Sequence, residues 1–318
     1  MSKTRVEWID LVRALAILTV LYIHASDGIY IISSDAIVNL TIYSRIFNFI
    51  SIFIGRIGVP FFLMITGYLL LDRSYDDEKV RKFWNKNCKG LIIVTIIWAI
   101  IYALCLQFIT VESSQVNFAE AGNLFFSHMW YMPMIIGMYL SLPFVTTVLA
   151  MHGIENVNIQ YCLGFSGGVY GIYILIGYLT KKGLFKKYSS NNLRILAIIS
   201  FAICVVFQYY AFTKGFGFDL WYEFPFILTG SFALFELCSR RGKVRAYPLV
   251  TFLAKYSFAV FLVHNIFRLP LLPLVVQLPY SEPVKAIILW ILLIVLSYLA
   301  TVIIYRIPRF GKFILYMR

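Results

Sequence analysis

The stretch LVRALAILTVLYIHASDGIYII, residues 11–32, is long and apolar enough to cross a membrane, yet it contains Arg13, His24 and Asp27. Arg13 and His24 are eleven residues apart. In a helix that is about three turns, so both side chains lie on one face, about 16 Å apart along the axis. Lipid would penalise ionisable groups on that face, so it must face the protein interior or a water-filled cavity. Both residues are therefore candidates for function.

The composition predicts a polytopic membrane protein. Hydrophobic residues make up 61% of the 318 residues, charged residues only 14%, and the mean hydropathy is +0.81. The first apolar segment is too long for a signal-peptide core and no small-residue cleavage site follows it, so it should remain as a helix. The net charge of +13 lies mostly in short loops beside the apolar segments, as the positive-inside bias produces, and we expect no nucleic-acid binding.

The five cysteines occur singly, without any spacing typical of a metal site. They are Cys88, Cys105, Cys162, Cys204 and Cys238. We interpret them as packing residues and expect no bound metal.

Hydropathy divides the chain into nine apolar segments. They lie near residues 11–32, 46–71, 90–109, 129–150, 161–180, 193–212, 220–238, 248–267 and 284–306. No repeat, low-complexity stretch or flexible linker separates them. We therefore predict a single membrane domain over residues 1–318, an all-α bundle of about 8 to 10 transmembrane helices.

Basic residues indicate the orientation. The N-terminus and the loop at 72–89 are rich in Lys and Arg, whereas residues 110–128 contain neither, so the N-terminus should be cytoplasmic. The later basic loop beginning at Lys181 should also be cytoplasmic, which requires an odd number of crossings after residue 128. Two apolar segments occupy that interval. We expect one irregular or re-entrant segment, near 161–180 or in its neighbour, or a missing span.

Four blocks of sequence resemble the membrane acyltransferase 3 family, typified by bacterial polysaccharide O-acetyltransferases. They are RVEWIDLVRALAILTVLYIH at 5–24, GVPFFLMITGY at 58–68, HMWYMPMIIGMYLSLPF at 128–144 and YSFAVFLVHNIF at 256–267. The resemblance implies a protein of about ten helices in the bacterial inner membrane. It also implies transfer of an acetyl or other short acyl group from cytoplasmic acyl-CoA to a sugar hydroxyl.

Two motifs of the family carry over and two features depart from it. The family's arginine, ten residues, then histidine pattern falls on Arg13 and His24, and its serine-glycine-tyrosine motif appears as Thr66-Gly67-Tyr68. The two-arginine motif of some members is absent, with Lys86 and Lys89 as the nearest match. Only residues 151–160 separate the WYM block from the glycine-rich segment, where members usually place another span. An inactive relative that lacks one span is therefore one alternative.

Acyl transfer to a hydroxyl requires a base, and histidine suits this task near neutral pH. His24 is the candidate, and Asp27, one turn later, could hold its ring in the required tautomer. Alternatively, His24 could itself take the acyl group and pass it on. His24 could instead have a structural role and form a hydrogen bond to a neighbouring helix. We interpret His264 and Asn265 in this way.

The acyl-CoA donor requires cations for its phosphates. Arg13 could grip a phosphate or the carbonyl end of the acyl arm, and Lys82, Lys86 and Lys89 form a basic helical face at the same membrane surface. Anchoring of the topology explains the lysines equally well. For Arg13 the alternative is a headgroup anchor paired with Asp10.

Four residues are candidates for binding the acceptor. Trp130 and Tyr131 could stack on a sugar or belong to an interfacial aromatic belt, and Glu223 could bind a sugar hydroxyl or face water. Pro60 should kink or break its helix, and Arg56 just before it could reach into the resulting cavity.

We therefore predict a multi-span O-acyltransferase, most simply an O-acetyltransferase that uses acetyl-CoA. Its acceptor would be a sugar of a cell-surface polysaccharide or of a lipid-linked precursor. It would acylate this acceptor directly or pass the group to a separate extracytoplasmic partner. The competing class is a transporter or exporter of glycan or lipid intermediates on the same scaffold.

Overall fold

A computed structural model describes residues 5–32, 40–109, 129–152, 169–215 and 220–317. All regular secondary structure in these ranges is helical, as the sequence predicts. The helices are α1 (Glu7–Ile32), α2 (Ile42–Arg56), α3 (Gly58–Leu70), α4 (Asp77–Phe83), the π-helix η2 (Trp84–Cys88), α5 (Lys89–Ile109), α7 (Tyr131–His152), α9 (Val169–Lys182), the 3₁₀ turn η3 (Leu184–Lys187), α10 (Ser190–Thr213), α11 (Pro225–Ser239), α12 (Tyr247–Val276), α13 (Glu282–Tyr305) and α14 (Phe310–Ile314).

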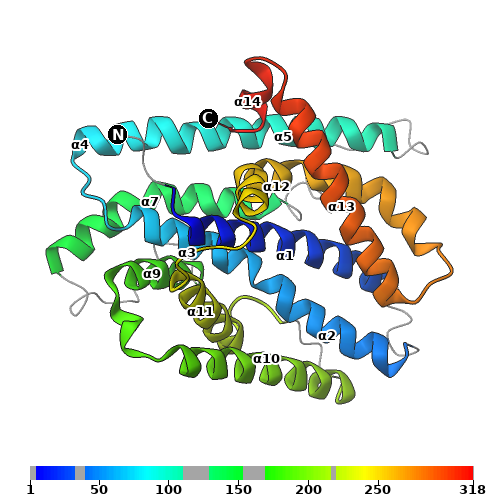
Figure 1. Cartoon of the computed structure of the whole chain (residues 1–318). Coiled ribbons are helices and arrows are strands. Elements are labelled where there is room, and N and C mark those ends of the chain that lie inside the picture. Colours follow the sequence, from blue (N-terminus) through cyan, green and yellow to red (C-terminus); the bar gives the residue numbers. More distant parts are fainter. Residues whose placement is uncertain (1–4, 33–39, 110–128, 153–168, 216–219, 318) are drawn as a thin grey trace.

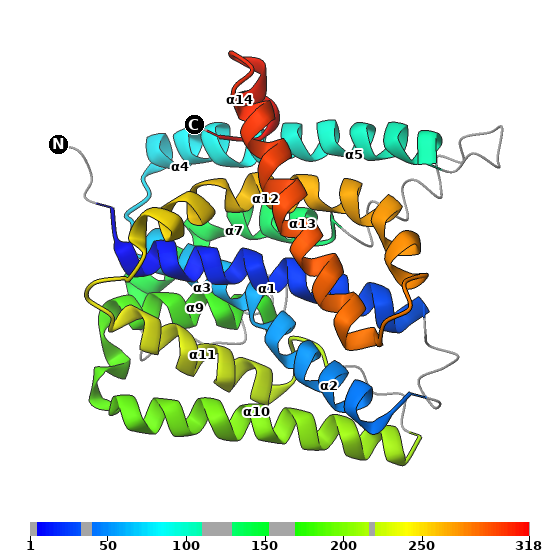
Figure 2. The same cartoon turned by 45° about the vertical axis from the view of Figure 1, so that its right-hand side comes forward.

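Helix α1 lies at the centre of the bundle, where it packs against α2, α3, α11, α12 and α13 (Figure 1). Val12, Ile17 and Leu21 of α1 are fully buried. Helices α5 and α10 cover opposite flanks, as Figure 2 shows. The polar residues of α1 are therefore held inside protein rather than against lipid.

The peripheral helices expose apolar side chains at helical spacing. These include Ile96, Ile100 and Leu104 of α5 and Ile291, Val295 and Leu299 of α13. Residues four apart share one helix face, and an apolar face without protein contacts suits a lipid environment. The chain is thus a multi-pass membrane protein.

Six helical stretches of the described chain are long and apolar enough to cross a membrane. They are Glu7–Tyr30, Ile42–Leu70, Asp77–Cys105, Ser190–Thr213, Tyr247–Val276 and Glu282–Tyr305, and shorter apolar helices occur at Tyr131–Thr146 and Pro225–Ser239. Each of the nine apolar segments predicted from the sequence contains a helix, with α9 in the fifth, 161–180. The structure does not establish the predicted number of 8 to 10 spans.

The second span is broken, because α2 ends at Arg56 and α3 begins at Gly58. Pro60 explains the break. It has no N–H to bond the carbonyl of Arg56, and its ring clashes with that carbonyl in a continuous helix. The predicted disruption at Pro60 is confirmed, and it leaves Arg56 at the end of a half-helix in the interior.

One end of the bundle, which we call the basic end, gathers the N-terminus of α1 and the Lys- and Arg-rich connections. Glu7 accepts a hydrogen bond from the backbone N–H of Val244 at 2.9 Å. Asp72, which follows α3, forms ion pairs with Lys181, at 3.2 Å, and with Lys182 at the end of α9. These two lysines, Lys182 above all, lower the pKa of Asp72 below its usual value and so keep the carboxylate charged. We call the opposite end of the bundle the far end.

Helices α3 and α9 run parallel toward the basic end and touch at two glycines. A Cβ on Gly67 would lie 1.7 Å from the carbonyl oxygen of Ile174, and one on Gly177 would lie 1.9 Å from that of Met64. Only glycine permits this approach. The contact fixes the position of α3, which carries Phe62 and Thr66 of the site described below.

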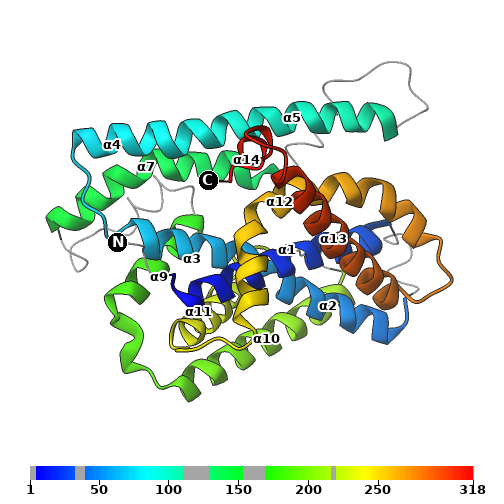
Figure 3. The same ribbon diagram turned by 45° about the horizontal axis from the view of Figure 1, so that its top comes forward.

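The segment predicted to be irregular, 161–180, is represented by α9, because residues 161–168 lie outside the described chain. With 14 residues, α9 is about 21 Å long, shorter than the hydrocarbon core of a bilayer. Helix α7 ends at the basic end, as α9 does, because Phe144 in the second half of α7 contacts Trp84 beside α4 (Figure 3). Two consecutive described helices thus run in the same direction, and the uneven number of crossings expected from the charges stays a prediction.

Candidate active site

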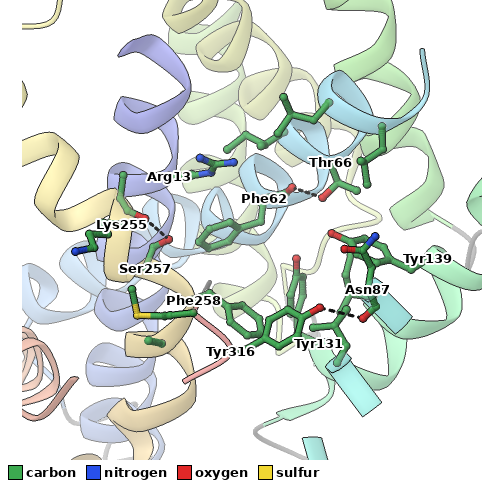
Figure 4. Close-up of a pocket in the computed structure, with 18 of the residues that line it drawn as sticks. Arg13, Phe62, Thr66, Asn87, Tyr131, Tyr139, Lys255, Ser257, Phe258 and Tyr316 are labelled. Atoms are coloured by element: carbon green, nitrogen blue, oxygen red, sulfur yellow. Dashed lines mark hydrogen bonds between the residues drawn. The ribbon is translucent and has the colours of Figure 1, made fainter. Parts of the chain in front are cut away.

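A cavity of about 620 Å³ lies at the basic end of the bundle. Figure 4 shows some of the side chains around it, among them Arg13 of α1, Phe62 of α3, Tyr131 of α7 and Phe258 of α12. We call it the donor pocket. Its inner end is aromatic and its outer part is basic.

Four cations line the donor pocket: Arg5, Arg13, Arg73 and Lys255. None of the described lining residues is acidic. Such a surface attracts anions, and guanidinium groups match phosphate oxygens in a bidentate geometry. A phosphate-bearing ligand suits this end of the pocket.

Asp10 organises two of these arginines. Its carboxylate is buried, pairs with Arg5, and lies 3.6 Å from the guanidinium of Arg13. It also accepts a hydrogen bond from the Tyr247 hydroxyl at 3.1 Å, which ties α1 to the start of α12. Arg13 therefore pairs with Asp10 and also lines the pocket, whereas its grip on a phosphate or on the acyl arm stays a prediction.

The lysines predicted to bind the donor are exposed, and none of Lys82, Lys86 and Lys89 lines the donor pocket. Asn87 does, from the π-helix η2. The wider turn changes which side chains face inward, and the Tyr316 hydroxyl donates to the carbonyl of Asn87 at 3.0 Å. Donor binding by the three lysines stays a prediction.

Thr66, which replaces the serine of the family motif, contributes a hydroxyl to the pocket wall. It donates to the carbonyl of Phe62 at 3.0 Å and is hydrogen-bonded to the Tyr139 hydroxyl. Figure 4 shows Thr66 and Tyr139 on the same side of the pocket, opposite Arg13. The hydroxyl that the sequence retains is therefore part of this pocket.

His24 lies further along α1, beside a second histidine from α12. The ring centroids of His24 and His264 are 5.2 Å apart. The Nδ1 of His264, which is fully buried, lies 2.7 Å from the carbonyl of Phe261, a geometry that assigns the proton to Nδ1. Its Nε2 then carries the lone pair. The sequence predicted a hydrogen bond from His264 to a neighbouring helix. This Nδ1 bond stays within α12 while the ring packs against His24 of α1, so the interhelical bond stays a prediction.

Arg268, one turn after His264, is a residue that the sequence interpretation missed. Its Nε donates to the carbonyl of His24 at 2.9 Å, and its side chain crosses α1 at Gly28, where an added Cβ would lie 3.1 Å from the guanidinium. It is also within electrostatic range of Asp27. A cation inside an apolar span is a functional signal in its own right, and that rule could have identified Arg268.

Arg56 joins an aromatic cluster on the same side of the structure as His24. It donates to the carbonyl of Leu220 at 3.0 Å, and its guanidinium lies 4.0 Å from the ring centroid of Trp221. It is within electrostatic range of His24. Buried as it is, Arg56 holds the connection before α11 in place, so its predicted contact with the acceptor remains a prediction.

The cluster consists of Trp130, Tyr170, Trp221 and Tyr222, whose ring centroids are within 6 Å of one another in most pairs. Glu223 is exposed next to it and within electrostatic range of Tyr170. Of the two aromatic residues predicted to bind a sugar, Trp130 belongs to this cluster. Tyr131 instead lines the donor pocket.

The described residues thus form two centres along α1. Arg13 belongs to the donor pocket at the basic end, whereas His24 and Asp27 lie with His264 and Arg268 about three turns further on. Among the described residues no three His, Cys, Asp or Glu side chains gather as a metal site would require.

No curated protein and no solved structure matches the chain. A family model described as an acyltransferase domain, the acyltransferase 3 type, matches residues 6–306, nearly the whole chain. The protein with this cationic pocket and this pair of histidines therefore belongs to the acyltransferase 3 family, and it is a multi-pass membrane enzyme that transfers acyl groups.

Proposed function

We propose that this protein is an O-acetyltransferase of the bacterial inner membrane. It would transfer the acetyl group of cytoplasmic acetyl-CoA to a sugar hydroxyl of a cell-surface polysaccharide or of its lipid-linked precursor. The observation that carries the proposal is the arrangement along α1, where a cationic pocket at one end is followed by His24 in a second centre toward the other.

The donor pocket supports the choice of an acyl-CoA. Coenzyme A combines several phosphate charges with a long, thin arm that ends in the thioester. The phosphates would lie among Arg5, Arg13, Arg73 and Lys255, and the arm would extend toward Phe62 and the other aromatic residues of the inner end. The basic end would face the cytoplasm, since basic loops are retained there and acyl-CoA is found there.

His24 would perform the chemistry. The acceptor oxygen attacks the thioester carbonyl carbon, a C–O bond forms and the C–S bond breaks. The hydroxyl proton passes to the imidazole and then to the leaving sulfur. If His24 takes the acetyl group first, the same bonds exchange in two steps through an acetyl-imidazole. Both routes pass through the ring of His24.

The acceptor would approach from the far end. Asp27, Trp130 and Glu223 carry polar or aromatic groups suited to a sugar, which proteins bind by hydrogen bonds to hydroxyls and by stacking on ring faces. Arg268, which donates to the backbone carbonyl of His24, would lie near the attacked carbonyl, where a fixed cation would stabilise the negative charge of the transition state.

The test is acetyl transfer by purified protein in lipid vesicles. With acetyl-CoA labelled in the acetyl group and a membrane glycan extract, wild type should label the glycan. His24→Ala should reduce the initial rate by roughly 10²-fold or more, because general base catalysis contributes about that much. Added imidazole should restore part of the activity, which would not occur if the substitution only disturbed packing.

Thr19→Ala is the matched control on the same helix. The Thr19 hydroxyl only donates to backbone carbonyls of its own helix, so this variant should retain full activity. Transfer that survives in His24→Ala would remove His24 from the mechanism. Absence of transfer in wild type with several glycan extracts would favour a transporter or an inactive relative.

A further inference from the structure

A second, much smaller cavity lies beside the donor pocket. Its volume is about 30 Å³, and it is lined by Val20, Val59, Phe62, Tyr131, Phe258 and Phe261. Three of these residues, Phe62, Tyr131 and Phe258, also line the donor pocket. We call these three residues the aromatic wall, because they separate the two cavities.

The small cavity lies between the donor pocket and the histidines. Val20, on its wall, precedes His24 by one helical turn. Phe261, also on its wall, contacts Tyr131 on one side, with ring centroids 5.6 Å apart, and His264 on the other, at 5.8 Å. An acyl group that extends from the donor pocket toward His24 therefore meets the aromatic wall and then this cavity.

The size of the cavity sets a limit on that group. A cavity needs a volume of about 10–15 Å³ to hold one water molecule. A volume of about 30 Å³ therefore holds about two groups of that size, which corresponds to the methyl and the carbonyl of an acetyl group. A butyryl group adds two methylenes, for which aromatic rings in a packed helical core leave no room.

We propose that Phe62, Tyr131 and Phe258 select the acyl group by length and restrict the enzyme to acetyl. This inference rests on the proposed function, since it assigns the acyl group to the path between the donor pocket and His24. The wall is apolar apart from the Tyr131 hydroxyl. It therefore discriminates by volume, and removal of one ring should extend the range of acyl groups to longer chains.

Binding of coenzyme A derivatives to the protein tests the selection by chain length without requiring acyl transfer. S-ethyl-CoA and S-butyl-CoA are stable thioethers that carry a short or a longer chain on the same coenzyme. Wild-type protein in detergent should bind S-ethyl-CoA at least about tenfold more tightly than S-butyl-CoA, since surplus methylenes at a tight apolar site are discriminated by roughly 10- to 200-fold. Phe258→Ala should reduce this ratio to roughly threefold or less.

Phe252→Ala is the matched control, because Phe252 lies on the same helix with its side chain 40% exposed and outside both cavities. It should leave the ratio unchanged. Phe62→Leu provides a second, milder enlargement on α3, and its folding can be checked by its thermal midpoint. The rates of transfer from labelled acetyl-CoA and from labelled butyryl-CoA can then be compared in the same variants.

The outcomes separate the two proposals. Chain-length discrimination that depends on Phe258, without transfer of any acyl group, would leave the selection in place and overturn the proposed function. Transfer that depends on His24, with equal binding of the two thioethers, would support the proposed function and overturn the selection by chain length. A ratio that stays unchanged in both Phe258→Ala and Phe62→Leu would overturn the selection, and so would the absence of binding by every coenzyme A derivative.

Discussion

At the scale of single residues, Arg268 brings a positive charge to His24. Its Nε lies 2.9 Å from the His24 carbonyl, and Gly28 leaves space for the side chain to cross α1. Attack on a thioester places negative charge on the carbonyl oxygen, and removal of one group that stabilises such charge typically costs 10²–10³-fold in rate. We therefore expect Arg268→Gln to lower kcat by about 100-fold and to leave the KM for acetyl-CoA unchanged, because the donor pocket lies at the other end of α1.

Initial rates at varied acetyl-CoA concentration check this prediction. Arg45→Gln is the control, since Arg45 also lies in an apolar helix but packs over the ring of Phe212, with 5.2 Å between the guanidinium carbon and the ring centroid. It should behave as wild type. A raised KM with an unchanged kcat would instead assign Arg268 to donor binding.

The sequence identifies Arg13 and His24 because ionisable residues in an apolar run stand out. It does not identify Arg5, Arg73 and Lys255 as parts of one pocket, because loops on the cytoplasmic side are basic whether or not they bind a ligand. It also cannot select Asn87 over its lysine neighbours. That choice depends on the π-helix at Trp84–Cys88, which shifts the register of the helix and leaves no signal in hydropathy.

At the scale of helices, the Gly67–Gly177 contact determines how closely α3 and α9 approach. Gly67→Ala would place a Cβ 1.7 Å from a backbone oxygen, so the two helices must separate. Overpacking of this kind typically costs 1–3 kcal/mol, and we expect the thermal midpoint to fall by roughly 5 °C. The donor pocket should loosen as well, because Phe62 and Thr66 lie on α3.

Thermal unfolding in detergent measures the effect, with Gly137→Ala as the control. An added Cβ on Gly137, within α7, meets nothing within 4 Å, and alanine favours a helix over glycine by about 1 kcal/mol. This variant should be as stable as wild type or slightly more stable. Equal midpoints for the two variants would show that α3 and α9 separate at no cost.

Two features of the helices follow from the sequence by physical rules. Pro60 disrupts the second span because it removes a donor and clashes with the preceding turn. The nine apolar segments follow from hydropathy, since each contains a helix, whereas the uneven number of crossings expected between residues 128 and 181 stays a prediction. The parallel contact of α3 with α9 does not follow, because it depends on which glycines face each other once both helices are packed.

At the scale of the whole molecule, the cations that line the donor pocket lie at the same end as the basic connections that follow α9 and α11. Ion pairs and hydrogen bonds join Asp72 to Lys181, and Glu7 to the connection before α12. The connection between α12 and α13, with Tyr280 exposed, lies at the other end (Figure 2). Under the proposed function this polarity matters, because acyl-CoA would reach the enzyme from only one side of the membrane.

We therefore expect Lys186 and Lys243 to face the cytoplasm and Tyr280 to face the opposite side. Lys186→Cys, Lys243→Cys and Tyr280→Cys can be placed one at a time in a full-length chain whose five native cysteines are replaced. A membrane-impermeant maleimide should label Tyr280→Cys in spheroplasts, and the other two only after permeabilisation. Labelling of Lys186→Cys and Lys243→Cys from opposite sides would contradict the common basic end. A fully inverted pattern would place the donor pocket away from its coenzyme and would overturn its assignment to acyl-CoA.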